Sequence, residues 1–146
     1  MQRRTFLAAA LAWPAGRALA KAPALFSTGG LAIHGYDPVA YFTDSRPVQG
    51  DPKIALKWGG AMWLFASVGN RSAFETDARA YAPQYGGYCA YAMAQGAVAT
   101  TVPEAWTVHE GRLFLNFSTG VRRIWRQDIS GNIRKADGFW PEALNG

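Results

Sequence analysis

Apolar residues alternate with more polar ones in the middle of the chain, as they do along half-buried β-strands. Residues 54–58 have this period, a glycine pair at 59–60 marks a tight turn, and residues 62–65 return as a second strand. Ser67 then supplies the N-cap of a helix that we expect to run to Tyr81, because its apolar residues recur at helical spacing. This stretch predicts a β-hairpin followed by a helix.

The same order of elements recurs downstream. Residues 106–108 and 113–117 predict two strands joined by a turn at 110–111, and Ser118 caps the helix that follows. We expect the apolar side chains of this helix to face inward and its arginines to face solvent. A last short helix over 133–140 ends at a proline.

An offset of about 51 residues superposes the first segment on the second. The paired positions are Gly60 and Gly111, Leu64 and Leu115, Ser67 and Ser118, Gly69 and Gly120, Arg71 and Arg122, and Asp77 and Asp128. Any two hairpin–helix units would share turn glycines and cap serines, whereas the arginine and aspartate pairs favour a degenerate tandem. We predict an α+β fold of two antiparallel β-hairpin plus helix units in one small domain, with residues 81–100 between them.

The first twenty residues have the features of an export signal. Arg3 and Arg4 precede a modest apolar run, and Ala18-Leu-Ala20 is a pattern that signal peptidase accepts. The arginine pair resembles a twin-arginine signal, and the apolar run is shorter than the ~20 residues that span a bilayer. We therefore expect cleavage after Ala20 by way of the export machinery, a periplasmic location, and no stable membrane span. Residues 21–30 would then form a flexible lead-in to a domain over 31–144.

Cleavage of the predicted signal would lower the net charge of the protein. Three of the 15 basic residues lie in the predicted signal, so the formal net charge of +5 falls to +2 for residues 21–146. The remaining Lys and Arg form no long run, which disfavours nucleic-acid binding. The chain has a single cysteine, so stability must come from packing and not from an internal disulfide.

That cysteine lies in the most unusual segment of the chain, residues 81–96, which is rich in tyrosine and glycine and carries no charge. Tyrosines that line a pocket combine an apolar ring with a polar hydroxyl, and a thiol or thioether is a soft donor. The candidate ligand-binding residues are Tyr85, Tyr88, Cys89, Tyr91 and Met93. The alternative is that the tyrosines pack the seam between the two units and that Cys89 is a buried, inert thiol. Either way, we expect the segment to be largely buried.

Several stretches resemble the YHS domain, a small module associated with heavy-metal binding. They are residues 35–40, where Asp37-Pro38 opens a short helical turn, then residues 63–67, 70–74 and 81–83. The later residues 84–90 and 133–141 are similar to exported, stand-alone YHS-domain proteins of bacteria, whose function is largely undefined. The resemblance implies a small binding domain with a metal site.

The chain departs from the metal-binding form of that family at the ligand positions. Where the metal-binding form has cysteines, this sequence has Ala40, Ala66 and Asn70. Alanine offers no donor, so the usual metal site is missing. The remaining candidate metal ligands are Cys89 and His34, for copper or zinc, although no pair has local ligand spacing.

We therefore expect a periplasmic protein that binds a small molecule or a metal ion near Cys89. Two alternatives remain at this point. One is a non-catalytic structural or interaction module of an envelope system. The other is a thiol-dependent enzyme, which would need a base and an orienting group beside the cysteine. No paired carboxylates or nucleophile signature accompany Cys89, and we lean toward a protein that is not an enzyme.

Overall fold

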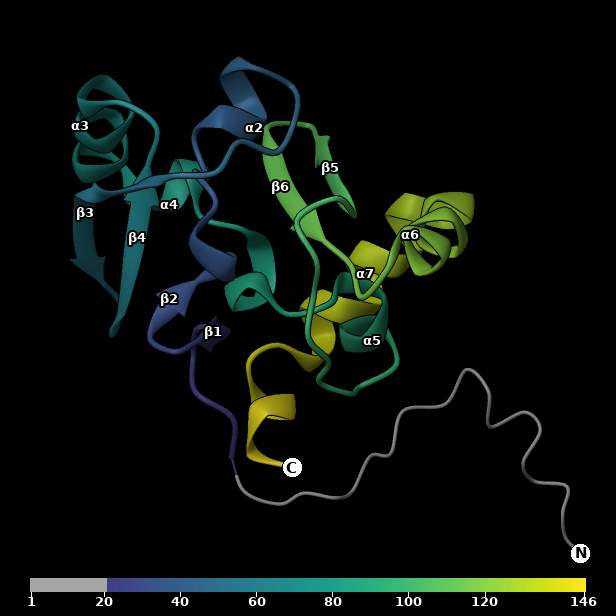
Figure 1. Ribbon diagram of the computed structural model, residues 1–146. Coiled ribbons are helices and arrows are strands. Elements are labelled where there is room, and N and C mark those ends of the chain that lie inside the picture. Colours follow the sequence, from purple (N-terminus) through teal and green to yellow (C-terminus); the bar gives the residue numbers. More distant parts are fainter. Residues whose placement is uncertain (1–20) are drawn as a thin grey trace, which may run out of the picture.

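The computed structural model describes residues 21–146, so the predicted export signal lies outside the described residues. The chain forms an α+β domain with two sheets (Figure 1). The strands are β1 Ser27–Thr28, β2 Leu31–Ala32, β3 Asp51–Trp58, β4 Ala61–Phe65, β5 Trp106–His109 and β6 Arg112–Leu115. The α-helices are α2 Ala40–Thr43, α3 Val68–Thr76, α4 Ala78–Tyr81, α5 Ala90–Ala94, α6 Thr119–Trp125 and α7 Ile129–Phe139. The short 3-10 segments are η2 Ile33–Gly35, η3 Gln84–Gly87, η4 Arg126–Asp128 and η5 Glu142–Asn145.

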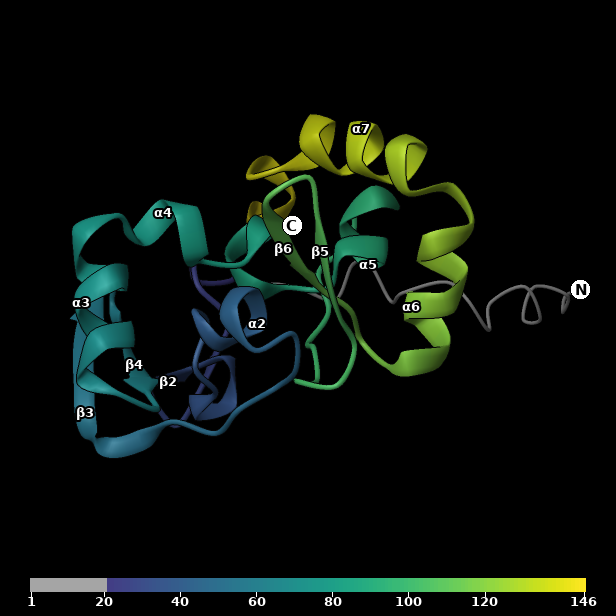
Figure 2. The ribbon, with the colours of Figure 1, turned by 90° about the horizontal axis from the view of Figure 1, so that it is seen from above.

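Both predicted hairpin–helix units are present, which confirms the predicted fold. The first sheet has the order β1-β2-β4-β3, with β2 parallel to β4 and the other pairs antiparallel. The second sheet is the antiparallel pair β5-β6. Figures 1 and 2 show β3, β4 and α3 at one end of the molecule, α6 at the other, and β5-β6 between them. Within residues 21–146, no helix is both long and apolar enough to cross a membrane.

The helix of each unit begins where the sequence predicts it. The Ser67 hydroxyl accepts a hydrogen bond from the amide of Asn70 at 3.0 Å, and that of Ser118 accepts one from Val121 at 3.1 Å. Each helix then buries one large aromatic residue completely, Phe74 in α3 and Trp125 in α6. Capping and the apolar face together therefore fix both helices.

The ends of these helices differ from the predictions. The first helix does not continue to Tyr81, because Asp77 has φ of −151° and ψ of 74° and separates α3 from α4. In the second unit the last helix, which we predicted over 133–140, already begins at Ile129 as α7. Arg122 does not face only solvent, since its Nε donates to the Thr107 hydroxyl at 3.0 Å.

The correspondence between the two units extends further toward the N-terminus than the sequence indicated. Residues 33–35 have φ values of 41°, 58° and 80°, and residues 85–87 have φ values of 59°, 65° and 87°. Both are therefore left-handed turns. Each closes with a hydrogen bond from the amide of the following tyrosine, Tyr36 or Tyr88, to the first carbonyl of the turn, at 3.1 and 3.0 Å.

Asp37 and Cys89 occupy equivalent positions just after these turns. The amide of Asp37 donates to the Val48 carbonyl at 2.9 Å, and the amide of Cys89 donates to the Ala99 carbonyl at 3.0 Å. A short helix follows each residue, α2 or α5. The offset is again about 51–52 residues, the same as for the hairpins.

The side chains of Asp37 and Cys89 also make equivalent contacts. Asp37 Oδ2 accepts from the amide of Ala66, and Cys89 Sγ accepts from the amide of Phe117, at 2.7 and 3.2 Å. Each side chain also accepts from the amide three residues further along the chain, at 3.3 and 3.4 Å. Residues 85–100 therefore open the second unit. We expected residues 81–100 to lie between two hairpin plus helix units. Both units are present, and most of the intervening segment belongs to the second one; its sequence has no recognisable pattern that would have indicated this.

Candidate functional site

A cleft of about 530 Å³ lies where the N-terminal segment of the described chain meets the turn between β3 and β4, the segment from α4 to η3, and Trp140. Its volume is in the range of small-molecule sites. The side chains and backbone that shape it most are Trp58, Arg79, Gln84, Tyr85, Gly86 and Trp140. We call it the Trp58–Trp140 cleft.

One wall of the cleft is formed by Ala24 and Leu25, which belong to the segment 21–30 that we predicted to be a flexible lead-in. Hydrogen bonds hold this segment at three points. The amide of Ala22 donates to the Leu144 carbonyl at 2.7 Å, and the amide of Phe26 donates to the Gly86 carbonyl at 2.9 Å. The Tyr88 hydroxyl donates to the Pro23 carbonyl at 2.7 Å.

Gly86 allows this wall to approach. Its φ is 65°, and a Cβ atom at this position would overlap the carbonyl oxygen of Ala24. Gly86 therefore has a steric role, which is to let two backbones meet beside the cleft.

The aromatic walls of the cleft are held from behind by the core. Trp58 is half-buried and packs edge-to-face on Trp63 and Phe74, with ring centroids 5.8 and 5.6 Å away. Trp140 packs edge-to-face on Tyr85 at 6.1 Å. The guanidinium carbon of Arg79 lies over the Trp58 ring, 5.7 Å from its centroid, while the residue itself is exposed.

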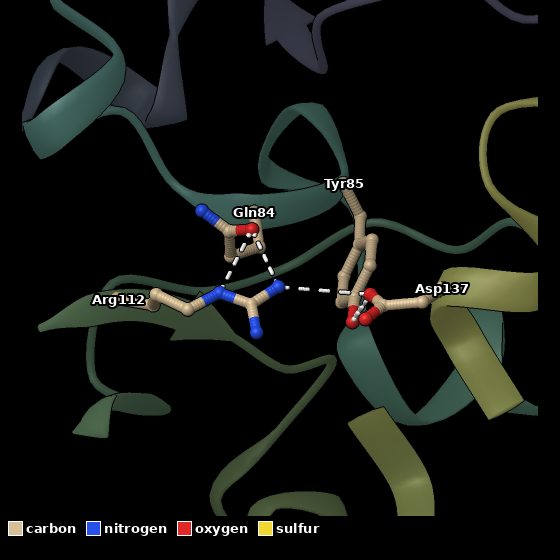
Figure 3. A network of polar contacts seen from close by, with 4 residues as sticks. All are labelled: Gln84, Tyr85, Arg112 and Asp137. Atoms are coloured by element: carbon tan, nitrogen blue, oxygen red, sulfur yellow. Dashed lines mark hydrogen bonds and ion pairs between the residues drawn. The ribbon is translucent and has the colours of Figure 1, made fainter. Parts of the chain in front are cut away.

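A polar network fixes the residues at the base of the cleft (Figure 3). Arg112 donates from Nε and Nη2 to Gln84 Oε1 at 3.2 and 2.9 Å, and Nη2 lies 3.6 Å from Asp137 Oδ1. The Tyr85 hydroxyl donates to the same Asp137 oxygen at 2.9 Å. Burial and this hydrogen bond raise the pKa of Tyr85, so its hydroxyl remains a donor. The network orients the Gln84 amide, whose nitrogen points away from Arg112.

Cys89 lies outside the cleft and is fully buried. Its thiol donates to Asn116 Oδ1 at 3.4 Å, and its sulfur accepts from the amides of Ala92 and Phe117. Burial raises the pKa of the Cys89 thiol, and the amide hydrogen bonds oppose this only in part. Because the thiolate is the reactive and metal-binding form, this environment favours an inert thiol.

His34 is held by a different set of groups. Its Nε2 lies 2.8 Å from the Thr101 carbonyl, its Nδ1 is 3.4 Å from the Thr28 hydroxyl, and its ring packs edge-to-face on Phe26. In the described part of the chain, His34 and Cys89 share no bond. No group of three His, Cys, Asp or Glu side chains there is placed to hold a metal ion.

Of the five predicted ligand-binding residues, Tyr85 alone lines the cleft. Tyr88 is buried against Phe26, and Met93 lies in the core with Trp125. Tyr91 is partly buried, and its amide donates to Asn116 Oδ1 at 2.9 Å. The expected burial of the segment is confirmed.

Gln84 and Gly86 line the cleft beside Tyr85 and belong to the tyrosine-rich segment 81–96. Sequence reasoning missed three cleft residues, which are Trp58, Arg79 and Trp140. They come from separate segments and share no local motif. A weak signal was available, since tryptophan is so large that it is rarely buried completely.

The three positions where the resembled family has cysteines meet around one carboxylate. Asp37 accepts from the amides of Ala40 and Ala66 and from the side-chain nitrogen of Asn70, the last at 2.8 Å. It also accepts from the amide of Val39 at 2.8 Å and is fully buried. Hydrogen bonds thus join α2, the end of β4 and α3 at this point. Comparison with protein-family models, curated proteins and solved structures found no match to this chain.

Proposed function

We propose that this protein is a periplasmic, non-catalytic YHS-type protein that binds a small molecule in the Trp58–Trp140 cleft. The observation that carries the proposal is the cleft itself, which combines two tryptophans with an exposed arginine on a well-supported base. Such a mixture of flat apolar walls and few polar groups is typical of ligand sites. The meeting of positions 40, 66 and 70 around Asp37 supports the YHS part of the proposal.

The binding site proposed here is displaced from the one expected at Cys89. Tyr85 belongs to both sites, because it is one of the residues predicted to bind a ligand near Cys89 and it also lines the cleft, where its ring packs on Trp140. Cys89 itself is engaged by three protein groups and is fully buried, so a ligand in the cleft would not touch it. These contacts favour a capping role for the thiol and give the thiol-dependent enzyme less support.

A thermal-shift screen of a small-molecule library tests the proposal. We expect ligands that stabilise the purified protein to lose their effect in Trp140→Ala, because a wall of the cleft is then missing. The matched control is Phe139→Ala, which truncates the neighbouring, 45% exposed aromatic residue that does not line the cleft. Ligands that stabilise both variants equally, or the absence of any stabilising ligand, would contradict the proposal.

A further inference from the structure

The charges around the cleft are unbalanced. Of the residues that line it, Arg79 is the one with a charged side chain, and no carboxylate lines it. The ion pairs between described residues are His109 with Glu110 and Arg112 with Asp137, so Arg79 has no acidic partner among them. Its guanidinium group contacts the Trp58 ring and keeps its N–H donors available.

A second donor faces no protein partner. The Oε1 atom of Gln84 already accepts two hydrogen bonds from Arg112, which fixes the amide orientation. Its Nε2 group therefore offers two N–H donors, and within residues 21–146 it has no hydrogen-bond partner. Gln84 and Arg79 both line the cleft.

Several of the acceptors near the cleft are already used. The Trp58 carbonyl accepts from Trp63 Nε1 at 3.0 Å, and the Gly86 carbonyl accepts from the amide of Phe26 at 2.9 Å. The Tyr85 hydroxyl donates to Asp137. The side chains of the cleft therefore offer mainly donors, and a cationic ligand would find no carboxylate among the lining residues to balance its charge.

We propose that the ligand of the cleft is a small organic monoanion with a flat ring and a carboxylate. The carboxylate accepts hydrogen bonds from Arg79 and Gln84, and the ring packs on Trp140. One positive charge and one neutral amide match a singly charged group better than a doubly charged phosphate. The tryptophan offers a flat, apolar face on which a ring stacks. This inference rests on the proposed function, since it specifies the ligand of that same cleft.

Titration calorimetry with three probes of one shape tests the charge requirement. The probes are naphthalene-2-carboxylate, its neutral carboxamide and the cationic naphthalen-2-ylmethylamine. We expect the carboxylate to bind about ten-fold or more tightly than the amide, as for a hydrogen bond to a charged group, and the amine to bind most weakly. The preference should disappear in Arg79→Gln and survive in part in Arg79→Lys.

The control separates a specific contact from general attraction. Lys57→Gln removes one positive charge from the neighbouring exposed position of β3 without changing the lining of the cleft. It should leave the carboxylate preference within about two-fold, because exposed charges are screened by salt. Equal binding of carboxylate and amide, or binding of neither, would overturn the inference. Trp140-dependent binding of the amide or of neutral library compounds would still leave the proposed function standing.

Discussion

Asp37 and Cys89 are different side chains that accept equivalent backbone hydrogen bonds at equivalent positions. The carboxylate of Asp37 accepts four hydrogen bonds from N–H groups. In the second unit these tasks are divided, because Cys89 Sγ accepts from Ala92 and Phe117 while Asn116 Oδ1 accepts from Tyr91. A buried backbone N–H needs an acceptor, and the sulfur and the amide oxygen together supply what one carboxylate supplies in the first unit.

Asp37→Asn should destabilise the protein by about 3 kcal/mol. The new amide nitrogen would face either the Val39 and Ala40 amides or the Ala66 amide and Asn70 Nδ2, all of which are donors. Urea unfolding followed by tryptophan fluorescence measures the change. The control Asp51→Asn alters an exposed carboxylate that accepts one amide hydrogen bond, and it should change the free energy of unfolding by less than about 0.5 kcal/mol. Similar losses in the two variants would show that the Asp37 contacts are not structural.

The buried acidic groups predict a loss of stability at alkaline pH. Burial raises the pKa of Cys89 from 9.0, and it also raises the pKa of Tyr41, Tyr85 and Tyr88 from 10.0. Above these ordinary values the unfolded chain releases protons that the folded chain still holds. The free energy of unfolding should therefore be constant between pH 7 and 8 and fall above pH 9.

Urea denaturation at pH 7, 8 and 10 measures this fall, and Cys89→Ser identifies the contribution of the thiol. Serine keeps an acceptor for the cap but does not titrate in this range. The variant should therefore lose less stability between pH 8 and 10 than the wild type does. An equal loss would mean that the tyrosines account for the whole effect.

At the scale of elements, the sequence predicts the parts whose signals are local. The two hairpins follow from alternation and glycine turns, and Ser67 and Ser118 mark helix starts that the structure confirms. The left-handed turns had little such signal beyond their glycines at 35, 86 and 87, because Ile33 and Tyr85 are residue types that rarely adopt positive φ. Only tertiary contacts impose these turns, so the full extent of the repeat could not be predicted.

The cleft was predictable only where it includes the segment 81–96, for a related reason. Tyr85 belongs to a segment of unusual composition, whereas Trp58, Arg79 and Trp140 lie in segments that are unremarkable when considered alone. They become a site because three elements meet there. Local pattern indicates which residues are suited to binding, but only the fold shows which of them converge.

Gly86→Ala should disrupt the close approach of the N-terminal segment to η3. The added Cβ would overlap the Ala24 carbonyl oxygen, and the backbone is left-handed at this position. We expect a loss of about 3 kcal/mol or more, with weaker binding of any ligand of the cleft. Thermal unfolding and calorimetry on the variant measure both effects.

Gly60→Ala is the matched control for this substitution. Gly60 also has a positive φ, 88°, but a Cβ there would have no atom within 4 Å. Its cost should be limited to the left-handed backbone, about 1–2 kcal/mol. If both substitutions cost the same, the overlap with Ala24 does not matter and the wall of the cleft is more adaptable than the structure implies.

At the scale of the whole molecule, the two ends of the described chain meet beside the cleft. The amide of Ala22 donates to the carbonyl of Leu144, and Leu144 packs with Phe26 and Tyr88 in a small buried cluster. Trp140 packs against the same cluster and also lines the cleft. The binding wall therefore depends on contacts between residues about 120 positions apart, which form only when the domain is complete.

Leu144→Ala should weaken the contact between the two ends of the described chain without unfolding the domain. Leu144 is 7% exposed, so the truncation leaves a cavity beneath residues 22–26 at a cost of about 2 kcal/mol. We expect faster hydrogen exchange at the amides of Ala22 and Phe26, with exchange in β4 unchanged, and an affinity for naphthalene-2-carboxylate lowered several-fold. Val68→Ala truncates a 57% exposed side chain in the first unit and should change neither quantity. Unchanged exchange at both amides in Leu144→Ala, together with unchanged affinity, would mean that the N-terminal wall is held by Gly86 and Tyr88 alone.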